Sequence, residues 1–277
     1  MRRATDSERW PRPTIVGIVN VTPDSFSDGG TYVDAAAAAD AAERMLADGA
    51  ALVDVGGEST RPGADDVSLD EELGRVVPVL ERLEGRRVSI DTSRAEVARR
   101  AVALGAELVN DVSALRRDPD LAGAVADSGA SLCLMHMQGE PRTMQEAPRY
   151  DDVVAEVAGF LEERLAFAVG SGIAEDRICL DPGFGFGKTP DHNLELLRRL
   201  DRIVAIGRPV MVGISRKSTL AQIVPGPDPR VGSDAASVGA AVSAFDRGAT
   251  LFRVHDVRSH VEALAVAAAV ERGTVER

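Results

Sequence analysis

Short apolar segments rich in Val, Ile and Leu alternate along this chain with longer segments of helical period. Apolar runs without polar alternation are typical of strands buried on both faces, as in parallel sheets. Eight strand–helix units in 277 residues favour a closed α/β architecture, a single-domain (β/α)8 TIM barrel over residues 14–272, rather than an open doubly wound sheet. The expected strands are Thr14–Asn20, Ala51–Val55, Val88–Asp91, Leu108–Asn110, Ser131–His136, Ile178–Asp181, Val210–Gly213 and Thr250–Val254. The expected helices span residues 33–48, 69–84, 93–104, 119–128, 151–170, 191–206, 233–247 and 256–271.

Composition removes several classes of protein. The formal net charge of −12 and the absence of a basic patch argue against a nucleic-acid partner. No apolar run reaches the roughly 18 residues of a membrane span, and the polar extension at residues 1–13 has no apolar stretch behind Arg2 and Arg3. Cys133 and Cys179 lie in apolar runs, which predicts buried thiols rather than a disulfide framework. We therefore expect a cytoplasmic protein.

Lysine is almost absent, since Lys188 and Lys217 are the only two in the chain and every other strong cation is arginine. A bias towards arginine codons explains the skew. Both lysines nevertheless sit beside Gly-rich or Ser-rich turns, where a compact charge with a movable pKa differs from a planar guanidinium.

Polar side chains end nearly every expected strand. In a barrel of this kind, the residues that follow the strands form the active site. A helix cap or a turn explains any single Asp, Asn or Ser at such a position, and Asp91-Thr92-Ser93 in particular resembles a helix start. Capping does not explain arginine, histidine or lysine there, so the set as a whole indicates a functional site. Its members are Asn20, Asp54 with Glu58–Arg61, Asp91, Asn110, Asp111, His136, Asp181, Ser215–Lys217, Arg253 and His255.

Five segments at these strand ends carry motifs. The Asp181–Thr189 segment resembles a phosphate-binding P-loop, but three residues separate Gly183 from Gly187 where that loop needs four, so nucleotide binding is rejected. The others are Gly17–Gly30, Asp54–Gly63, Gly213–Ser218 and Arg253–Asp256.

Taken together in this order, the five segments resemble the dihydropteroate synthase family, over about residues 14–270. The pairing of Asn-Val-Thr-Pro-Asp-Ser-Phe-Ser-Asp-Gly-Gly with Gly-Glu-Ser-Thr-Arg-Pro-Gly is the most specific part. The resemblance implies a transferase that joins 6-hydroxymethyl-7,8-dihydropterin pyrophosphate to p-aminobenzoate.

The resemblance also implies three sub-sites. Asp91, Asn110 and Asp181 would contact the edge of the pterin ring, Lys217 would face a ring carbonyl or nitrogen, and Cys133 and Met135 would line the slot. Asn20 would ligate Mg2+, while Arg61, Arg253 and His255 would hold the pyrophosphate. Phe26, Thr60, Pro62, Phe186 and Ser218 would surround p-aminobenzoate. Arg61, Lys217, Arg253 and His255 are the expected catalytic residues, and Phe184 is expected to be a core residue.

Two alternatives stay open at this point. One is a pterin-binding methyltransferase domain that serves corrinoid proteins, against which the intact Thr22–Gly30 and Ser59–Gly63 segments speak. The other is a paralogue that keeps the fold without synthase activity. The family is usually homodimeric, and the Ala-rich segment Val261–Val270 offers either a contact face for a second copy or packing onto the barrel, of which the packing is slightly favoured.

Overall fold

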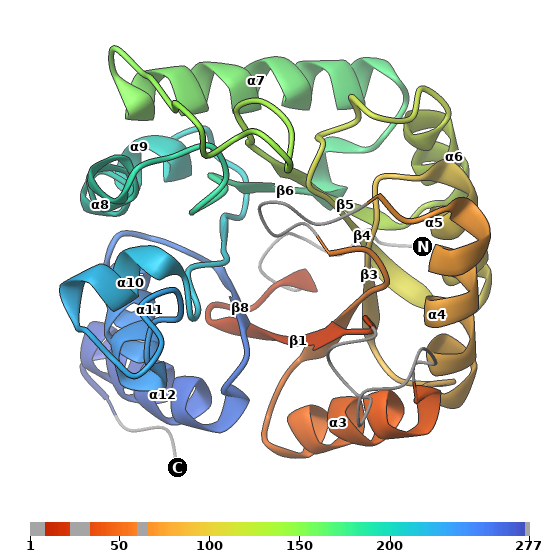
Figure 1. Cartoon of the computed structure of the whole chain (residues 1–277), viewed down its shortest axis with the longest axis horizontal. Helices are drawn as coiled ribbons and strands as arrows, with labels where there is room; N and C mark the ends of the chain where they lie inside the picture. The colour runs from red at the N-terminus through yellow and green to blue at the C-terminus, as the bar shows by residue number, and fades with distance from the viewer. Residues whose placement is uncertain (1–8, 23–33, 60–65, 275–277) are drawn as a thin grey trace.

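Eight parallel strands form one sheet, and Figure 1 shows the helices arranged around it. The computed structural model describes residues 9–22, 34–59 and 66–274. The order of neighbours is β6-β5-β4-β3-β2-β1-β8-β7, and a parallel bridge between Leu180 and Val210 joins the two edges into a barrel. The (β/α)8 expectation is confirmed. The strands are β1 (Thr14–Asn20), β2 (Leu52–Gly56), β3 (Val88–Asp91), β4 (Ala106–Asp111), β5 (Ser131–Met135), β6 (Ile178–Asp181), β7 (Met211–Val212) and β8 (Leu251–Val254).

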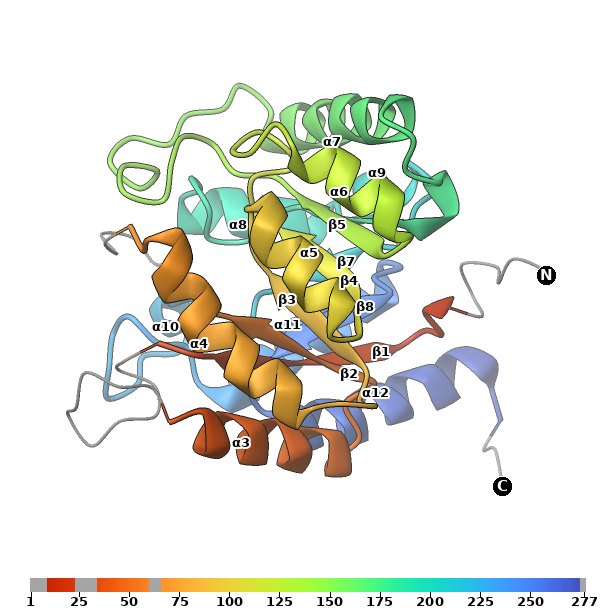
Figure 2. The ribbon, with the colours of Figure 1, turned by 90° about the vertical axis from the view of Figure 1, so that its right-hand side faces the viewer.

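The helices lie outside the strands, and Figure 2 shows α3, α4 and α5 on that outer layer from the side. The expected helix over residues 191–206 is instead two, α8 and α9, and the short α10 was not expected. Within the described residues no helix is both long and apolar enough to cross a membrane. The helices are α3 (Ala35–Ala47), α4 (Leu69–Arg82), α5 (Ala95–Ala103), α6 (Leu121–Ser128), α7 (Val153–Gly170), the 3-10 turn η1 (Glu175–Arg177), α8 (Pro190–Arg198), α9 (Asp201–Val204), α10 (Ser218–Ile223), α11 (Asp234–Asp246) and α12 (Val257–Arg272).

Side-chain caps fix where several helices begin. Ser68 and Glu71 form a reciprocal capping box on α4, and Asp34 and Asp152 accept backbone N–H groups at the starts of α3 and α7. These capping residues lie in the loops, several positions beyond the strands. The acids at the strand ends therefore remain available for other contacts.

An apolar cluster, called the lower cluster below, fills the end of the barrel at which the strands begin. Trp10, which belongs to the N-terminal extension expected to be polar, is 3% exposed and packs there with side chains from the amino-terminal halves of the strands. Polar groups are thereby confined to the opposite end, where the strands finish. The other members of the cluster are Val16, Leu52, Leu108, Cys133, Cys179, Met211 and Leu251.

Candidate active site

The carboxyl ends of the strands bring the predicted polar residues together. The sheet register aligns Asn20 of β1 with Gly56 of β2, then with Asp91 of β3 and Asn110 of β4. On the other side of the barrel, Met135 of β5 pairs with Asp181 of β6. A ring of polar groups thus forms the mouth because parallel strands end at the same level.

Arg253 of β8 connects two carboxylates across this mouth. Its Nε donates to Oδ2 of Asp54 at 2.6 Å, and its Nη2 donates to Oδ2 of Asp91 at 2.8 Å. Nδ2 of Asn110 donates to the same Asp54 oxygen at 3.0 Å. The two bonds use two of the five N–H donors of the guanidinium, which leaves it able to bind an anion as well.

Burial and neighbouring charges shift the pKa values of the groups in this cluster. Burial raises the pKa of Asp91, an effect that Arg253 opposes and the neighbouring Asp54 reinforces. Burial alone would lower the pKa of Arg253, but attraction by Asp54 and Asp91 raises it overall. Arg253 therefore stays charged, whereas Asp91 takes up a proton more readily than an ordinary aspartate does.

Asp181 lies at the same mouth of the barrel as Lys217 and Arg253. Its side chain is 5% exposed, and Oδ1 accepts the backbone N–H of Gly183 at 2.7 Å, as expected of an aspartate that starts a turn. Burial raises the pKa of Asp181 to about 6, while Gly183, Lys217, Arg253 and Lys188 act to lower it. Lys217 and Arg253 thus act on one carboxylate, so the acidic groups and the cations share one end of the barrel.

An apolar wall stands beside these charges. Phe186 packs against a cluster that contains Met135, Val112, Met137 and Met144. The ammonium nitrogen of Lys217 lies 4.2 Å from the centre of the Phe186 ring. Such a surface, apolar with a cation at its rim, suits a flat aromatic ligand.

The remaining described site residues occupy the rim. His255 follows β8, and its Nδ1 lies 3.1 Å from Oγ of Ser215 in the turn after β7. Ser218 is exposed at the first position of α10, next to Lys217, and Asn20 is partly exposed at the end of β1. Phe26, Thr60, Arg61 and Pro62 lie outside the described residues.

Two core residues clarify the limits of the site. Cys133 was expected to line the slot, but it is fully buried in the lower apolar cluster beside Cys179. Its register partner on β4 is Asn110, and its place in the slot stays a prediction. Phe184 is 1% exposed and belongs to the core, as predicted.

Sequence reasoning placed Asp54 and His136 in the set of polar strand ends but gave neither of them, nor Lys188, a place in a sub-site. Asp54 is 1% exposed and accepts hydrogen bonds from both Asn110 and Arg253. Lys188 is 2% exposed and its Nζ lies 2.8 Å from Nδ1 of His136. The signal for Asp54 was its place at a strand end, and the signal for Lys188 was the rarity of lysine in the chain.

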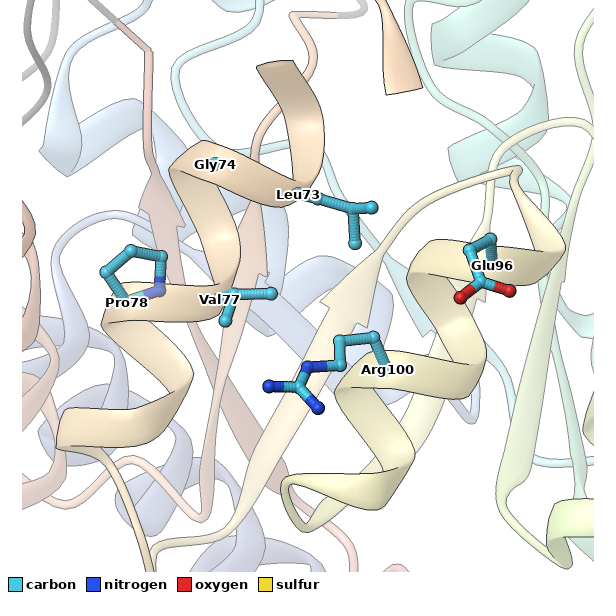
Figure 3. Close-up of a pocket in the computed structure, with 6 residues that line it drawn as sticks. All are labelled: Leu73, Gly74, Val77, Pro78, Glu96 and Arg100. Carbon is cyan, nitrogen blue, oxygen red and sulfur yellow. The ribbon is translucent and has the colours of Figure 1, made fainter. Parts of the chain in front are cut away.

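Two surface hollows lie away from this mouth. One of about 300 Å³ lies between α4 and α5, and Figure 3 shows Leu73 and Val77 facing Glu96 and Arg100 there. The other, of about 590 Å³, lies at the base of the barrel around Trp10 and includes Arg9, Arg87 and Arg177. Neither is lined by a residue at the carboxyl end of a strand, so neither is the candidate active site.

The sequence profile described as "Pterin binding enzyme" matches residues 16–255. A curated dihydropteroate synthase of Escherichia coli K12 is 48% identical over 258 residues, which cover 92% of this chain and 90% of the relative. The chain belongs to the dihydropteroate synthase family.

Solved structures agree with this assignment. A dihydropteroate synthase of Xanthomonas albilineans with 4-aminobenzoic acid is 50% identical and gives a TM-score of 0.87 over 94% of both chains. The enzyme of the same organism in complex with 7,8-dihydropteroate is 46% identical, with a TM-score of 0.84 over 94% of both chains.

Proposed function

We propose that this mouth condenses 6-hydroxymethyl-7,8-dihydropterin pyrophosphate with p-aminobenzoate, giving 7,8-dihydropteroate and pyrophosphate in folate biosynthesis. The observation that carries the proposal is the meeting of Asp91 and Asp181 with Arg253 and Lys217 at one end of the barrel. The ligands of the Xanthomonas albilineans structures, 4-aminobenzoic acid and 7,8-dihydropteroate, are one substrate and the product of this reaction.

Asp91, Asn110 and Asp181 read the donor edge of the pterin ring, with Lys217 at a ring acceptor and Met135 beneath the ring. Burial raises the pKa of both aspartates, so each gains from a ring N–H that satisfies its carboxylate. A carboxylate bound to the ring also stabilises positive charge that develops as pyrophosphate leaves. Asp54 shapes this pocket by holding Asn110 and Arg253.

Arg61, Arg253 and His255 hold the pyrophosphate and stabilise the charge that builds up on it as the bond breaks. Asp54 and Asp91 fix the orientation of the Arg253 guanidinium, so ordering this group costs little free energy when the anion binds. His255 is oriented by Ser215.

The donor set fits Mg2+ as the cofactor. Asn20 offers an amide oxygen at the rim, and the described residues contain no group of three or more His, Cys, Asp or Glu side chains that would form a protein cage for a metal. Mg2+ commonly uses one or two protein oxygens and takes the rest from substrate phosphates and water. Bound there, the ion supplies charge neutralisation on the pyrophosphate.

The proposal assigns p-aminobenzoate to Phe26, Thr60 and Pro62, which lie outside the described residues, and to the wall of Phe186, with Ser218 near its carboxylate. An aromatic amine is neutral near pH 7, so the attacking nitrogen needs no general base. The methylene carbon of the pterin receives that nitrogen as the bond to pyrophosphate oxygen breaks, and the amine proton passes to water or pyrophosphate.

The test is turnover of labelled p-aminobenzoate by the purified protein with Mg2+ and the pterin pyrophosphate. Arg61→Ala should abolish turnover and leave the affinity for free pterin nearly unchanged, whereas Asp181→Ala should weaken pterin binding itself. Formation of no product by a folded wild-type protein would favour a paralogue without synthase activity. Equal effects of the two substitutions on pterin affinity would contradict the assignment of sub-sites.

We further propose a cytoplasmic homodimer. The two cysteines are both free thiols, which suits a reducing compartment. On α12, Leu264 and Ala268 pack on the barrel while Val266 and Val270 are 65% and 76% exposed, so the segment serves packing and also presents an apolar face.

A further inference from the structure

The side chain of Lys188 is buried beside the mouth and surrounded by acceptors. Its Nζ donates to the carbonyl oxygens of Gly183 and Phe186, each at 3.0 Å, and contacts Nδ1 of His136 at 2.8 Å. The carbonyl oxygen of His136 lies a little farther, at 3.4 Å. One ammonium group thus ties the loop after β6 to the end of β5.

Burying a cation costs free energy unless hydrogen bonds replace its water. Burial lowers the pKa of Lys188 to about 7, with Asp181 opposing this effect and Lys217 reinforcing it. Burial and the positive charges of Lys188 and Arg116 lower the pKa of His136 to about 2, so the imidazole is neutral and Nδ1 can accept. A protonated Lys188 has three donors, which match two loop carbonyls and this nitrogen.

The loop held by Lys188 is packed directly on the chain after β5. A side chain at Gly183, where φ is +69°, would collide with the carbonyl oxygen of His136, and one at Gly187 would collide with that of Gln138. The hydroxyl of Tyr150 donates to the carbonyl oxygen of Gly187 at 2.8 Å. These close contacts restrict the backbone of the loop to one path, and the ammonium group of Lys188 lies among the carbonyl groups of that loop.

Phe186 lies between the two lysines of the chain. The ammonium group of Lys217 faces its ring at 4.2 Å, and that of Lys188 holds its carbonyl oxygen at 3.0 Å. Asp181 is held by backbone donors, since the N–H of His136 donates to its carbonyl oxygen at 2.9 Å and the N–H of Gly183 donates to its Oδ1 at 2.7 Å. Lys188 donates directly to the carbonyl oxygen of Phe186, whereas it acts on the Asp181 carboxylate through its charge.

We propose that Lys188, with His136 as its acceptor, is a positioning residue that sets the backbone of Phe186 and so shapes the p-aminobenzoate side of the mouth. This inference rests on the proposed function, in which Phe186 packs against p-aminobenzoate. It assigns Lys188 no contact with either substrate.

The first experiment compares Lys188→Met with Tyr150→Phe in steady-state kinetics. Methionine keeps the apolar stem and removes the donors, so the KM for p-aminobenzoate should rise about tenfold or more, because small misplacements at a reacting site have large effects. The dissociation constant for free pterin should change by less than about threefold, a split that identifies the sub-site affected. Tyr150→Phe removes one outer hydrogen bond to the same loop and should leave the KM within about twofold of wild type.

A second pair covers the case in which Lys188→Met does not fold. His136→Asn keeps an acceptor near the position of Nδ1 and should retain the KM, whereas His136→Leu removes it and should raise the KM. A purely structural role would lower the melting temperature of His136→Leu with the KM unchanged, and that result overturns the proposal. An unchanged KM in folded Lys188→Met also overturns it. Absence of turnover by the wild-type protein would instead refute the proposed function.

Discussion

The buried carboxylate of Asp181 lowers the stability of the folded protein, and the same carboxylate is proposed to bind the pterin. Burial raises its pKa from 3.8 to about 6 in the folded protein. The folded state therefore binds more protons than the unfolded state between these values, and its stability falls as the pH rises through that window. Above it the ionised group costs about 3 kcal/mol, since one pKa unit corresponds to about 1.4 kcal/mol.

Asp181→Asn should consequently stabilise the protein while weakening its ligand binding. At about pH 7.5 the urea midpoint should exceed that of wild type, and the difference should vanish below about pH 4. Isothermal titration with free pterin should show weaker binding, because an amide oxygen is a poorer acceptor for a ring N–H than a carboxylate. Undiminished pterin affinity in the variant would refute the role given to Asp181.

Individual site residues differed in how far the sequence predicted them. Asp91, Asn110, Asp181 and Arg253 were predictable because each lies at or next to the end of a strand, and parallel strands place their ends together. The partnership of Arg253 with Asp54 joins residues 199 positions apart, and no local pattern reports it. Lys188 stands in a motif that resembles a phosphate loop, yet its actual neighbour is His136 from another strand.

At the scale of elements, the loop after β6 depends on glycine. Gly183 combines a positive φ with backbone contact to His136, whereas Gly159 lies exposed on α7 with nothing near the position of a Cβ atom. Alanine is strained in the first setting and favoured in the second, because a helix interior prefers alanine to glycine.

Gly183→Ala should lower the free energy of unfolding by about 3 kcal/mol, from backbone strain plus overpacking. Gly159→Ala, the matched control, should raise it by about 0.5–1 kcal/mol. Urea unfolding monitored by circular dichroism measures both. A Gly183→Ala protein as stable as wild type would mean that the contact between the β5 and β6 loops relaxes freely.

The sequence predicted strands best where a polar residue marks the end of a mainly apolar run. β1, β3 and β6 match their predicted limits, because each is a mainly apolar run ended by Asn or Asp. The run at 210–213 yields only the two-residue β7, since Val210 bridges to Leu180 instead. The division between α8 and α9 near Arg199 has no glycine or proline to mark it, and α10 is too short for periodicity to detect.

For the whole molecule, charge and apolar surface act against each other. A net charge of −12 makes two copies of the chain repel one another. Val266 and Val270 are one helical turn apart on α12 and highly exposed, which makes this face a candidate for association. Burial of such apolar area is favourable, but the repulsion persists until salt screens it.

The proposed homodimer should therefore strengthen with ionic strength. Light scattering after gel filtration should show a larger dimer fraction at about 0.15 M salt than at about 0.01 M, where the screening length is about three to four times greater. The double substitution Val266→Lys with Val270→Lys should give a monomer with an unchanged melting profile, because neither side chain is buried in the barrel. The matched pair Arg258→Lys with Glu262→Asp, at an exposed ion pair of the same helix, should leave the dimer intact. A wild-type protein that stays monomeric at both salt concentrations would rule out this assembly, and a dimer that survives the double lysine substitution would place its interface on another face.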